Sequence, residues 1–288
     1  MLSRLLNWLN GLFRDPHRRF LRGNALDDMT DKQANVEPLG VAEDNVVREL
    51  DADLGAHLDL TADLFNFIGK VMSQLPDVRW TKISQPRKVI IALMMRLAND
   101  LRCASLLAIR GYPAQAAGLV ASMYEVAQTI VFIGANEERA ERWNNHDHLK
   151  RPFMGAWDLT MEVMRDLGVP DLEKHVARRY QIYTQLCMEK HANPISEKAD
   201  AFQVTPDGII FTQGPRSTPQ AVRTGRFALE HAASLSFVAT AAVIQGHIEA
   251  SAQDPLERQL KTFHARHKQL HEESRRRYPE GDPFPGKW

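Results

Sequence analysis

The chain has 288 residues, with 36 basic side chains, 36 acidic side chains and two cysteines. Its composition, 44% hydrophobic and 25% charged, is that of a soluble globular protein and excludes a disordered chain, a collagen-like repeat and a disulfide scaffold. A net charge of zero argues against a protein that coats nucleic acid along its whole surface. Because Cys103 and Cys187 could form at most one disulfide, we expect free thiols in a cytoplasmic protein.

Although the net charge is zero, basic and acidic residues are separated into different regions at the start of the chain. Residues 1–23 carry five arginines against one acid, and their leucines recur at helical spacing, so they predict a basic amphipathic helix. We expect this helix to dock on its own domain or on a second copy, or to lie on the inner membrane. Residues 24–42 are acidic and lack periodicity, as is typical of a linker, and a helical domain is expected over residues 43–288.

Helices are predicted through most of that domain. Apolar residues at a spacing near 3.6 indicate helices at 43–75, 84–111, 113–134, 136–149, 156–167, 170–191, 219–252 and 255–277. Gly111 and Pro113 separate the second and third of these, which therefore form a long antiparallel hairpin. The segment 201–213, with Pro206-Asp207-Gly208 between alternating apolar residues, predicts a small β-hairpin. The sequence thus predicts an all-α helical bundle built around the 84–111/113–134 hairpin.

Charged residues inside this apolar hairpin are the first candidates for a functional site. Glu125 belongs to a polar seam on the second helix of the hairpin, and it also argues against a membrane span there. If the hairpin turns at 111–112, Glu125 lies opposite Arg96 and Asp100, and an unpaired buried carboxylate would draw in such a partner. We therefore expect a buried Glu125–arginine pair. It would serve either as a core ion pair or as part of an acid–base pocket.

Two histidine-containing groups have spacings that suggest metal binding. Cys187 and His191 lie four residues apart on one helix, as in a Cys–His dyad or half a zinc site, but no second ligand pair has matching spacing. His146 and His148 flank Asp147, yet residues two apart on a helix point away from each other. A core cysteine beside a helix-terminal histidine is therefore the better interpretation of the first group, and we expect neither a metal nor a cofactor.

The last predicted helix carries two parallel stripes. One is apolar and should pack on the domain or on a partner. The other is basic, and it is most simply a solvated face or else a contact for RNA or another anion that strengthens as its histidines protonate. This basic stripe consists of Lys261, His264, Lys268, His271 and Arg275.

The hairpin turn, the first part of the helix that follows it and a later tyrosine–histidine motif resemble a bacterial family of helical proteins of unknown function. The resemblance rests on the run Arg110-Gly-Tyr-Pro-Ala-Gln-Ala-Ala-Gly-Leu-Val-Ala-Ser-Met-Tyr-Glu125 and on the later Tyr183-x-x-Leu186…His191-x-x-Pro194. Ala121 departs from the arginine that the family often has before the serine. The resemblance spans roughly residues 50–250 and implies a cytoplasmic helical bundle in which Glu125 and His191 face one cleft.

A second similarity is to HEPN ribonucleases, helical bundles whose active site contains an arginine followed by a histidine, with four to six residues between them. Five pairs here have this spacing: Arg139/His146, Arg142/His148, Arg226/His231, Arg258/His264 and Arg266/His271. Chance alone predicts about three such pairs in a chain with this many arginines and histidines. Arg142 and His148, separated by polar Asn144 and Asn145, are the pair chosen as the alternative site.

Motifs for ATP-driven, zinc-protease and α/β-hydrolase chemistry are missing from the sequence. It has no phosphate-cradling glycine loop, nucleophile elbow, paired CxxC motif or HExxH motif. Two expectations follow. The first is an intracellular interaction or regulatory protein that acts through a protein partner or self-association, and the alternative is a metal-independent RNase or a related stress or phage-defence effector.

Overall fold

Eight α-helices make up most of the described part of the chain. The computed structural model describes residues 38–75, 80–190, 202–205, 208–211 and 214–277. The predicted N-terminal helix at 1–23 and residues 24–37 of the predicted linker lie outside the described residues. The described residues from Ala42 onward belong to one compact unit, and the all-α class predicted from the sequence is confirmed.

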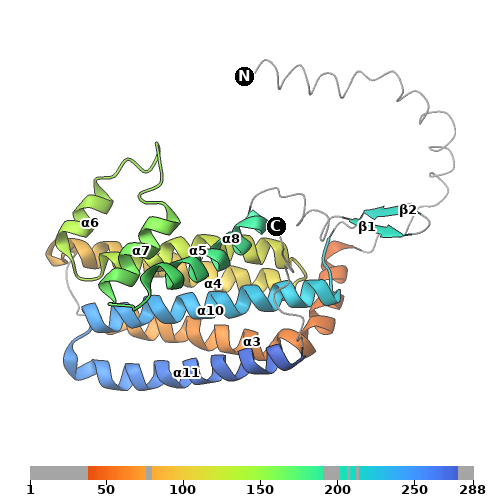
Figure 1. Cartoon of the computed structure of the whole chain (residues 1–288). Coiled ribbons are helices and arrows are strands. Elements are labelled where there is room, and N and C mark those ends of the chain that lie inside the picture. Colours follow the sequence, from red (N-terminus) through yellow and green to blue (C-terminus); the bar gives the residue numbers. More distant parts are fainter. Residues whose placement is uncertain (1–37, 76–79, 191–201, 206–207, 212–213, 278–288) are drawn as a thin grey trace, which may run out of the picture. The chain divides into compact units, whose positions relative to one another are not determined.

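The helices follow the predicted order along the chain (Figure 1). They are α3 (Leu39–Ser73), α4 (Gln85–Ile109), α5 (Pro113–Ile133), α6 (Glu137–Asn144), α7 (Ala156–Asp166), α8 (Leu172–Lys190), α10 (Pro219–His247) and α11 (Ala250–Arg277), with a short 3₁₀ helix, η2, at Trp80–Lys82. Two strands, β1 (Phe202–Thr205) and β2 (Gly208–Phe211), pair antiparallel with Phe202 opposite Phe211.

Four helix ends differ from the sequence prediction by four or more residues, and one of them is the end of α10, at His247 instead of residue 252. Helix α3 begins four residues early, at Leu39, because the carbonyl of Pro38 accepts a hydrogen bond from the Val41 amide at 2.8 Å. Helix α6 ends at Asn144 instead of continuing to residue 149, and the chain then forms turns. Helix α11 begins at Ala250, so Pro255 lies inside the helix at an exposed position rather than at its start.

The predicted antiparallel hairpin is formed by α4 and α5, which pack against each other. Gly111 makes the turn with a φ of 82°, a left-handed conformation that favours glycine. A Cβ atom at Gly111 would lie 2.4 Å from the backbone nitrogen of Arg216. That nitrogen donates a hydrogen bond of 3.0 Å to the Gly111 carbonyl. The turn therefore also fixes the chain that leads into α10.

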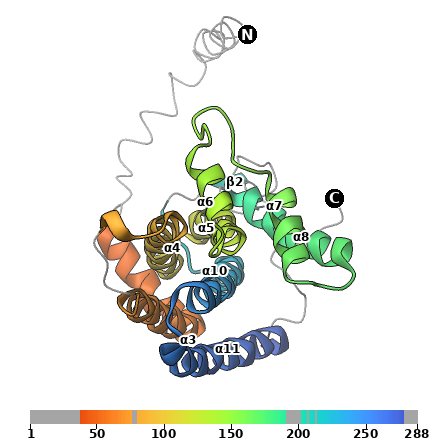
Figure 2. The ribbon, with the colours of Figure 1, turned by 90° about the vertical axis from the view of Figure 1, so that its left-hand side faces the viewer.

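Helix α10 lies at the centre of the bundle (Figure 2). It packs on α4, α5 and α11, and α8 packs on α5 and α7. Small residues on α10, including the fully buried Ala228, Ala232 and Ala239, allow several neighbours to approach this one helix closely. Several polar side chains on α10 are consequently buried among other helices, and buried polar groups of this kind are candidates for a functional site.

Helices α5 and α10 are long and apolar enough to cross a membrane by length and composition alone. Of their most apolar stretches, 78% and 72% of the residues are buried inside the protein. Core helices of soluble proteins have the same properties, so these two helices are weak evidence for a membrane location.

Candidate functional site

The predicted buried pair between Glu125 and an arginine of the facing helix is wrong. Oε1 of Glu125 accepts a hydrogen bond of 2.7 Å from the hydroxyl of Tyr183 and lies 3.4 Å from Nζ of Lys190, both on α8. Arg96 pairs instead with Asp100 of its own helix, at 3.5 Å. The polar seam of α5 faces α8, which comes so close that a Cβ atom on Gly118 would lie 3.3 Å from Cα of Lys190.

The residues of the predicted acid–base pocket are therefore not brought together. The side chain of Arg96 is 60% exposed on α4, whereas Glu125 faces α8, and His191 lies outside the described residues. Burial raises the pKa of Asp100, and the adjacent Arg96 offsets this increase only in part. Burial likewise raises the pKa of the Cys187 thiol, beside the hydroxyl of Tyr183. Within the described ranges, no three histidine, cysteine or acidic side chains are placed to hold a metal ion.

Arg142 and His148, the alternative pair, are exposed at and just beyond the end of α6. The Arg142 guanidinium lies over the rings of Phe132 and Phe153, at 5.4 and 5.3 Å. Nε2 of His148 is 2.8 Å from the carbonyl oxygen of Trp143, so it carries the proton and donates. His146 lies beside His148 with ring centroids 4.9 Å apart, in turns rather than on a helix. Each side chain thus has a structural contact within this segment.

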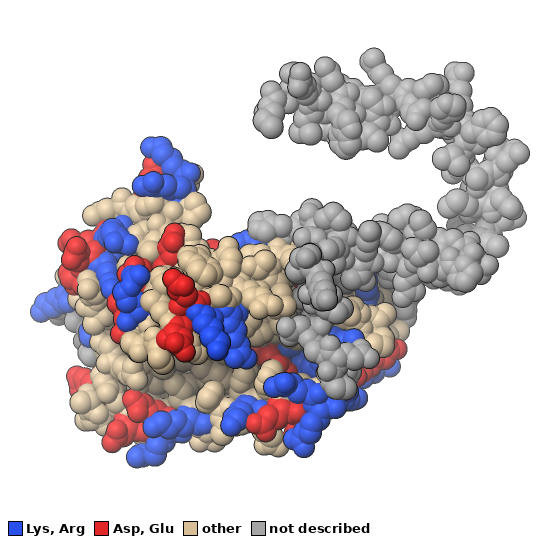
Figure 3. Space-filling view, viewed as in Figure 1, with Lys and Arg blue, Asp and Glu red and all other residues tan. Residues whose placement is uncertain are grey.

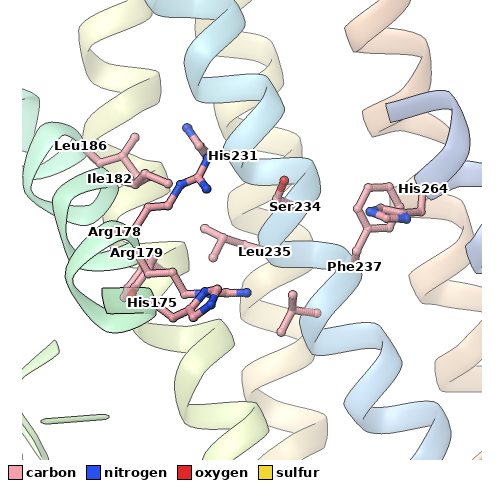
Figure 4. A pocket seen from close by; sticks show the side chains of 12 residues that line it. His175, Arg178, Arg179, Ile182, Leu186, His231, Ser234, Leu235, Phe237 and His264 are labelled. Atoms are coloured by element: carbon pink, nitrogen blue, oxygen red, sulfur yellow. The ribbon is translucent and has the colours of Figure 1, made fainter. Parts of the chain in front are cut away.

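A cleft between α8, α10 and α11 brings many cationic and titratable side chains together. It consists of two adjoining parts of about 410 and 530 Å³, whose linings share Arg178, Ile182, His231 and Ser234. Both volumes fall in the range of small-molecule binding sites, about 300–1,000 Å³. We call the larger part the polar chamber and the smaller part, shown in Figure 4, the apolar chamber.

The side chains that line the cleft are strongly biased toward positive charge. Five arginines and five histidines contribute, and Glu230 is the one acid among the described residues of the lining. The arginines are Arg178, Arg179, Arg223, Arg226 and Arg275, and the histidines are His175, His231, His264, His267 and His271. Concave sites lined by one sign of charge concentrate ligands of the opposite sign, because field lines are focused there.

Glu230 organises one wall of the polar chamber from its buried position on α10. Its Oε2 lies 2.7 Å from Nδ1 of His271 on α11, and its Oε1 lies 3.3 Å from Nε2 of His57 on α3. Nε of Arg226 is 3.8 Å from the same Oε1. The side chain of Glu230 is only 11% exposed, whereas that of His271 is 50% exposed. One buried carboxylate therefore joins three helices and orients a histidine at the cleft.

The charge state of this cluster follows from its contacts. Burial alone would raise the pKa of Glu230, but hydrogen bonds with His271 and His57 outweigh it and hold the pKa well below its usual range. Burial lowers the pKa of His267, which its hydrogen bond to the Glu230 carbonyl only partly offsets. Glu230 is thus an ionised carboxylate, and its charge is already matched by residues of the cluster.

Sequence reasoning missed Glu230 and His57 and interpreted part of the cleft differently. The basic stripe of α11 divides: His264, His271 and Arg275 line the cleft, whereas Lys261 and Lys268 approach Glu257 and Glu272 on the exposed face, at 3.8 and 3.9 Å. Of the five arginine–histidine pairs, Arg226/His231 is the one with both members in the lining. His57 and Glu230 are 173 residues apart, so no local spacing could have joined them.

No protein-family model, curated protein or solved structure matches this chain. The resemblances to a helical family of unknown function and to HEPN ribonucleases stay predictions. Any function must therefore be inferred from the chemistry of the α8–α10–α11 cleft itself.

Proposed function

We propose that the protein binds a phosphate-bearing small molecule in the α8–α10–α11 cleft. The observation that carries this proposal is the set of five arginines and five histidines around one cavity, with a single, already paired carboxylate. Guanidinium groups suit phosphate because their planar donors can form two parallel, charge-assisted hydrogen bonds to its oxygens. Histidines add donors, and they add positive charge when they are protonated.

The distribution of charge elsewhere favours a compact anion over a long nucleic-acid strand. Figure 3 shows basic and acidic side chains interspersed over the described part of one face. Lys261 and Lys268 on α11 each lie near an acid of the same helix, which weakens any basic track leading away from the cleft. Extended nucleic-acid sites instead follow the backbone with a basic stripe or groove.

Isothermal titration of the full chain with pyrophosphate and with ATP, at low and at physiological salt, tests this function. We expect binding that weakens as salt rises, because the contacts are ionic. Exchange of Arg178 and Arg275 for alanine removes two exposed side chains from the lining. This change should weaken binding of the probes by about tenfold or more.

The matched control exchanges Lys261 and Lys268 for alanine, which removes the same charge from the exposed face of α11. It should leave binding within about twofold of the unchanged chain, since only screened long-range attraction is lost. The proposal fails if neither probe binds. It also fails if the control pair weakens binding as much as the cleft pair does.

The contact between Glu230 and His271 favours a second function, metal-independent cleavage of a phosphodiester in the same cleft. A carboxylate on Nδ1 fixes the tautomer of a histidine and stabilises its protonated form, as a general base requires. In RNA, such a base would take the proton of the 2′-hydroxyl, whose oxygen would attack phosphorus and expel the 5′-oxygen. The 5′-oxygen would take a proton from water, so the products would be a 2′,3′-cyclic phosphate and a 5′-hydroxyl. An arginine such as Arg226 would stabilise the negative charge that develops on the phosphate oxygens.

RNA cleavage in the presence of a chelator tests this second function. If it is correct, His271→Ala should abolish cleavage, and the double exchange Arg226→Ala with His231→Ala should reduce it strongly. The double exchange Arg142→Ala with His148→Ala should leave it unchanged, because those residues are exposed near α6. Cleavage that is lost only in the Arg142/His148 variant would move the site to α6, and cleavage in none of the proteins would remove this function.

The role as an interaction or regulatory protein, expected from the sequence, stays a proposal that the cleft can accommodate. A protein that changes its partners when a small anion binds would combine both roles. Light scattering with and without the bound probe measures whether self-association responds to the ligand.

A further inference from the structure

The two chambers of the cleft differ in what they offer a ligand. The apolar chamber is lined largely by hydrocarbon and aromatic groups from α5, α8 and α10: Tyr124, Ile182, Leu186, Leu235, Phe237 and Val238. The polar chamber instead holds Arg178, Arg223, Arg226 and Arg275 together with Gln181 and Gln185. A ligand that fills both must therefore carry a negative charge at one end and a flat or apolar group at the other.

The junction between the chambers sets how such a ligand would lie. Arg178 and His231 line both chambers, and in Figure 4 they lie on facing helices at one side of the apolar chamber. Ser234, also shared, places a hydroxyl on α10 between the two. Donors at the junction would contact the part of the ligand that connects its charged end to its apolar end.

From this arrangement we propose that the ligand is a nucleotide, with its phosphates in the polar chamber and its base in the apolar chamber. This inference rests on the proposed function and specifies its ligand. The base would contact Phe237, whose ring packs edge-on against that of His264, with 5.6 Å between the ring centroids, on the side of the chamber toward α11. Binding through arginines needs no glycine-rich loop, which agrees with the absence of that motif from the sequence.

Polar groups around the apolar chamber favour a base over an acyl chain. His175, Arg179 and His264 line it together with the hydrocarbon side chains, and Figure 4 shows His175 and Arg179 on α8 and His264 on α11, at the other side of the chamber. The nitrogen and oxygen atoms at the edge of a base can form hydrogen bonds with such groups. An acyl chain would leave these groups desolvated without a partner, at a cost to its affinity.

Comparison of five probes by titration tests the inference: ATP, AMP, adenosine, pyrophosphate and dihexanoyl phosphatidic acid. ATP should bind at least about tenfold more tightly than pyrophosphate, because stacking of the base on aromatic rings adds to the affinity. Adenosine should bind weakest among the nucleotide-derived probes, since it lacks the charge that the arginines contact. The short-chain phospholipid should bind no better than pyrophosphate.

Two substitutions in the apolar chamber separate the base from the phosphates. Val238→Trp would fill this chamber from a partly exposed position on α10, and His264→Ala would remove an exposed ring from its wall. Each substitution should weaken the binding of ATP by about tenfold, whereas the affinity for pyrophosphate should stay within about twofold of its original value. Because His264 is exposed, its variant should fold even if the tryptophan variant does not, and unchanged melting temperatures would verify this.

The results that overturn the nucleotide assignment differ from those that overturn the proposed function. Pyrophosphate binding as tightly as ATP, with neither affected by His264→Ala, would leave an anion site without a base chamber. Preferential binding of the phospholipid would replace the base with an acyl group. Failure of every charged probe would remove the proposed function along with this inference.

Discussion

Oε2 of Glu230 and Nδ1 of His271 are 2.7 Å apart, which joins the buried centre of α10 to a half-exposed histidine of α11. The same carboxylate reaches His57 of α3 through its other oxygen, at 3.3 Å. A carboxylate with partners on both sides is stable in the interior only while those partners remain. This relationship therefore links the stability of the bundle to the shape of the cleft.

Glu230→Gln should destabilise the protein at neutral pH. Loss of the charge weakens hydrogen bonds to two histidines, and bonds to charged groups contribute about 1.5–3 kcal/mol each. We expect the free energy of unfolding, measured with urea, to fall by about 1.5–3 kcal/mol. Glu272→Gln on the exposed face of α11, where Glu272 approaches Lys268 at 3.9 Å, is the control and should change the free energy of unfolding by about 0.5 kcal/mol or less. Equal stability of both variants would contradict the role given to Glu230.

The contribution of Glu230 should also depend on pH in a defined direction. Its pKa is held below the value of 4.5 that an unperturbed glutamate has. At acidic pH the unfolded chain therefore binds a proton more readily than the folded chain does. The difference in free energy of unfolding between the unchanged protein and Glu230→Gln should have its full size above pH 4.5. It should shrink as the pH falls below that value. A difference that grows on acidification would show that the folded carboxylate is not stabilised.

His247, at the C-terminal end of α10, provides a second pH-dependent test. It is buried, and its Nε2 donates a 2.9 Å hydrogen bond to the carbonyl of Gly134. Burial lowers its pKa from 6.5, so below that pH the unfolded chain takes up a proton that the folded chain resists. Stability should decline as pH falls from 7.5 to 5.5, and less steeply in His247→Gln, which keeps a donor. Parallel profiles would contradict this assignment.

Gly111→Ala tests the turn of the helical hairpin. Alanine would have to adopt a φ of 82° and bring Cβ within 2.4 Å of the Arg216 nitrogen. We expect a loss of about 2–4 kcal/mol in the free energy of unfolding. Gly69→Ala in α3, where a Cβ meets no atom within 4 Å, is the matched control and should be neutral or stabilising by about 0.5–1 kcal/mol. Similar values for the two would show that the turn is not constrained.

The helices were largely predictable from the sequence because their cause is local. Apolar periodicity and turn residues such as Gly111 and Pro113 depend on neighbours within a few positions, and they located the α4–α5 hairpin to within one or two residues. The orientation of a helix about its own axis depends on distant partners. Glu125 was therefore expected to face α4, although it faces α8, where Tyr183 and Lys190 contact it.

The cleft could be predicted only in part, for the same reason. His264, His271 and Arg275 stood out in the sequence as a basic stripe, but the pattern cannot tell a solvated face from one that lines a cavity. Glu230 is unremarkable in sequence, since a single acid in a long helix usually faces solvent. Its role becomes visible only when α3 and α11 are placed beside α10.

Imidazole NMR spectra recorded during a pyrophosphate titration show whether an anion binds in the α8–α10–α11 cleft. We expect the resonances of His175, His231 and His264, which line the cleft, to shift together and saturate. Those of His146 and His148, near the end of α6, should stay in place. Shifts confined to His146 and His148, or no saturable shift at the cleft histidines, would contradict anion binding in the cleft.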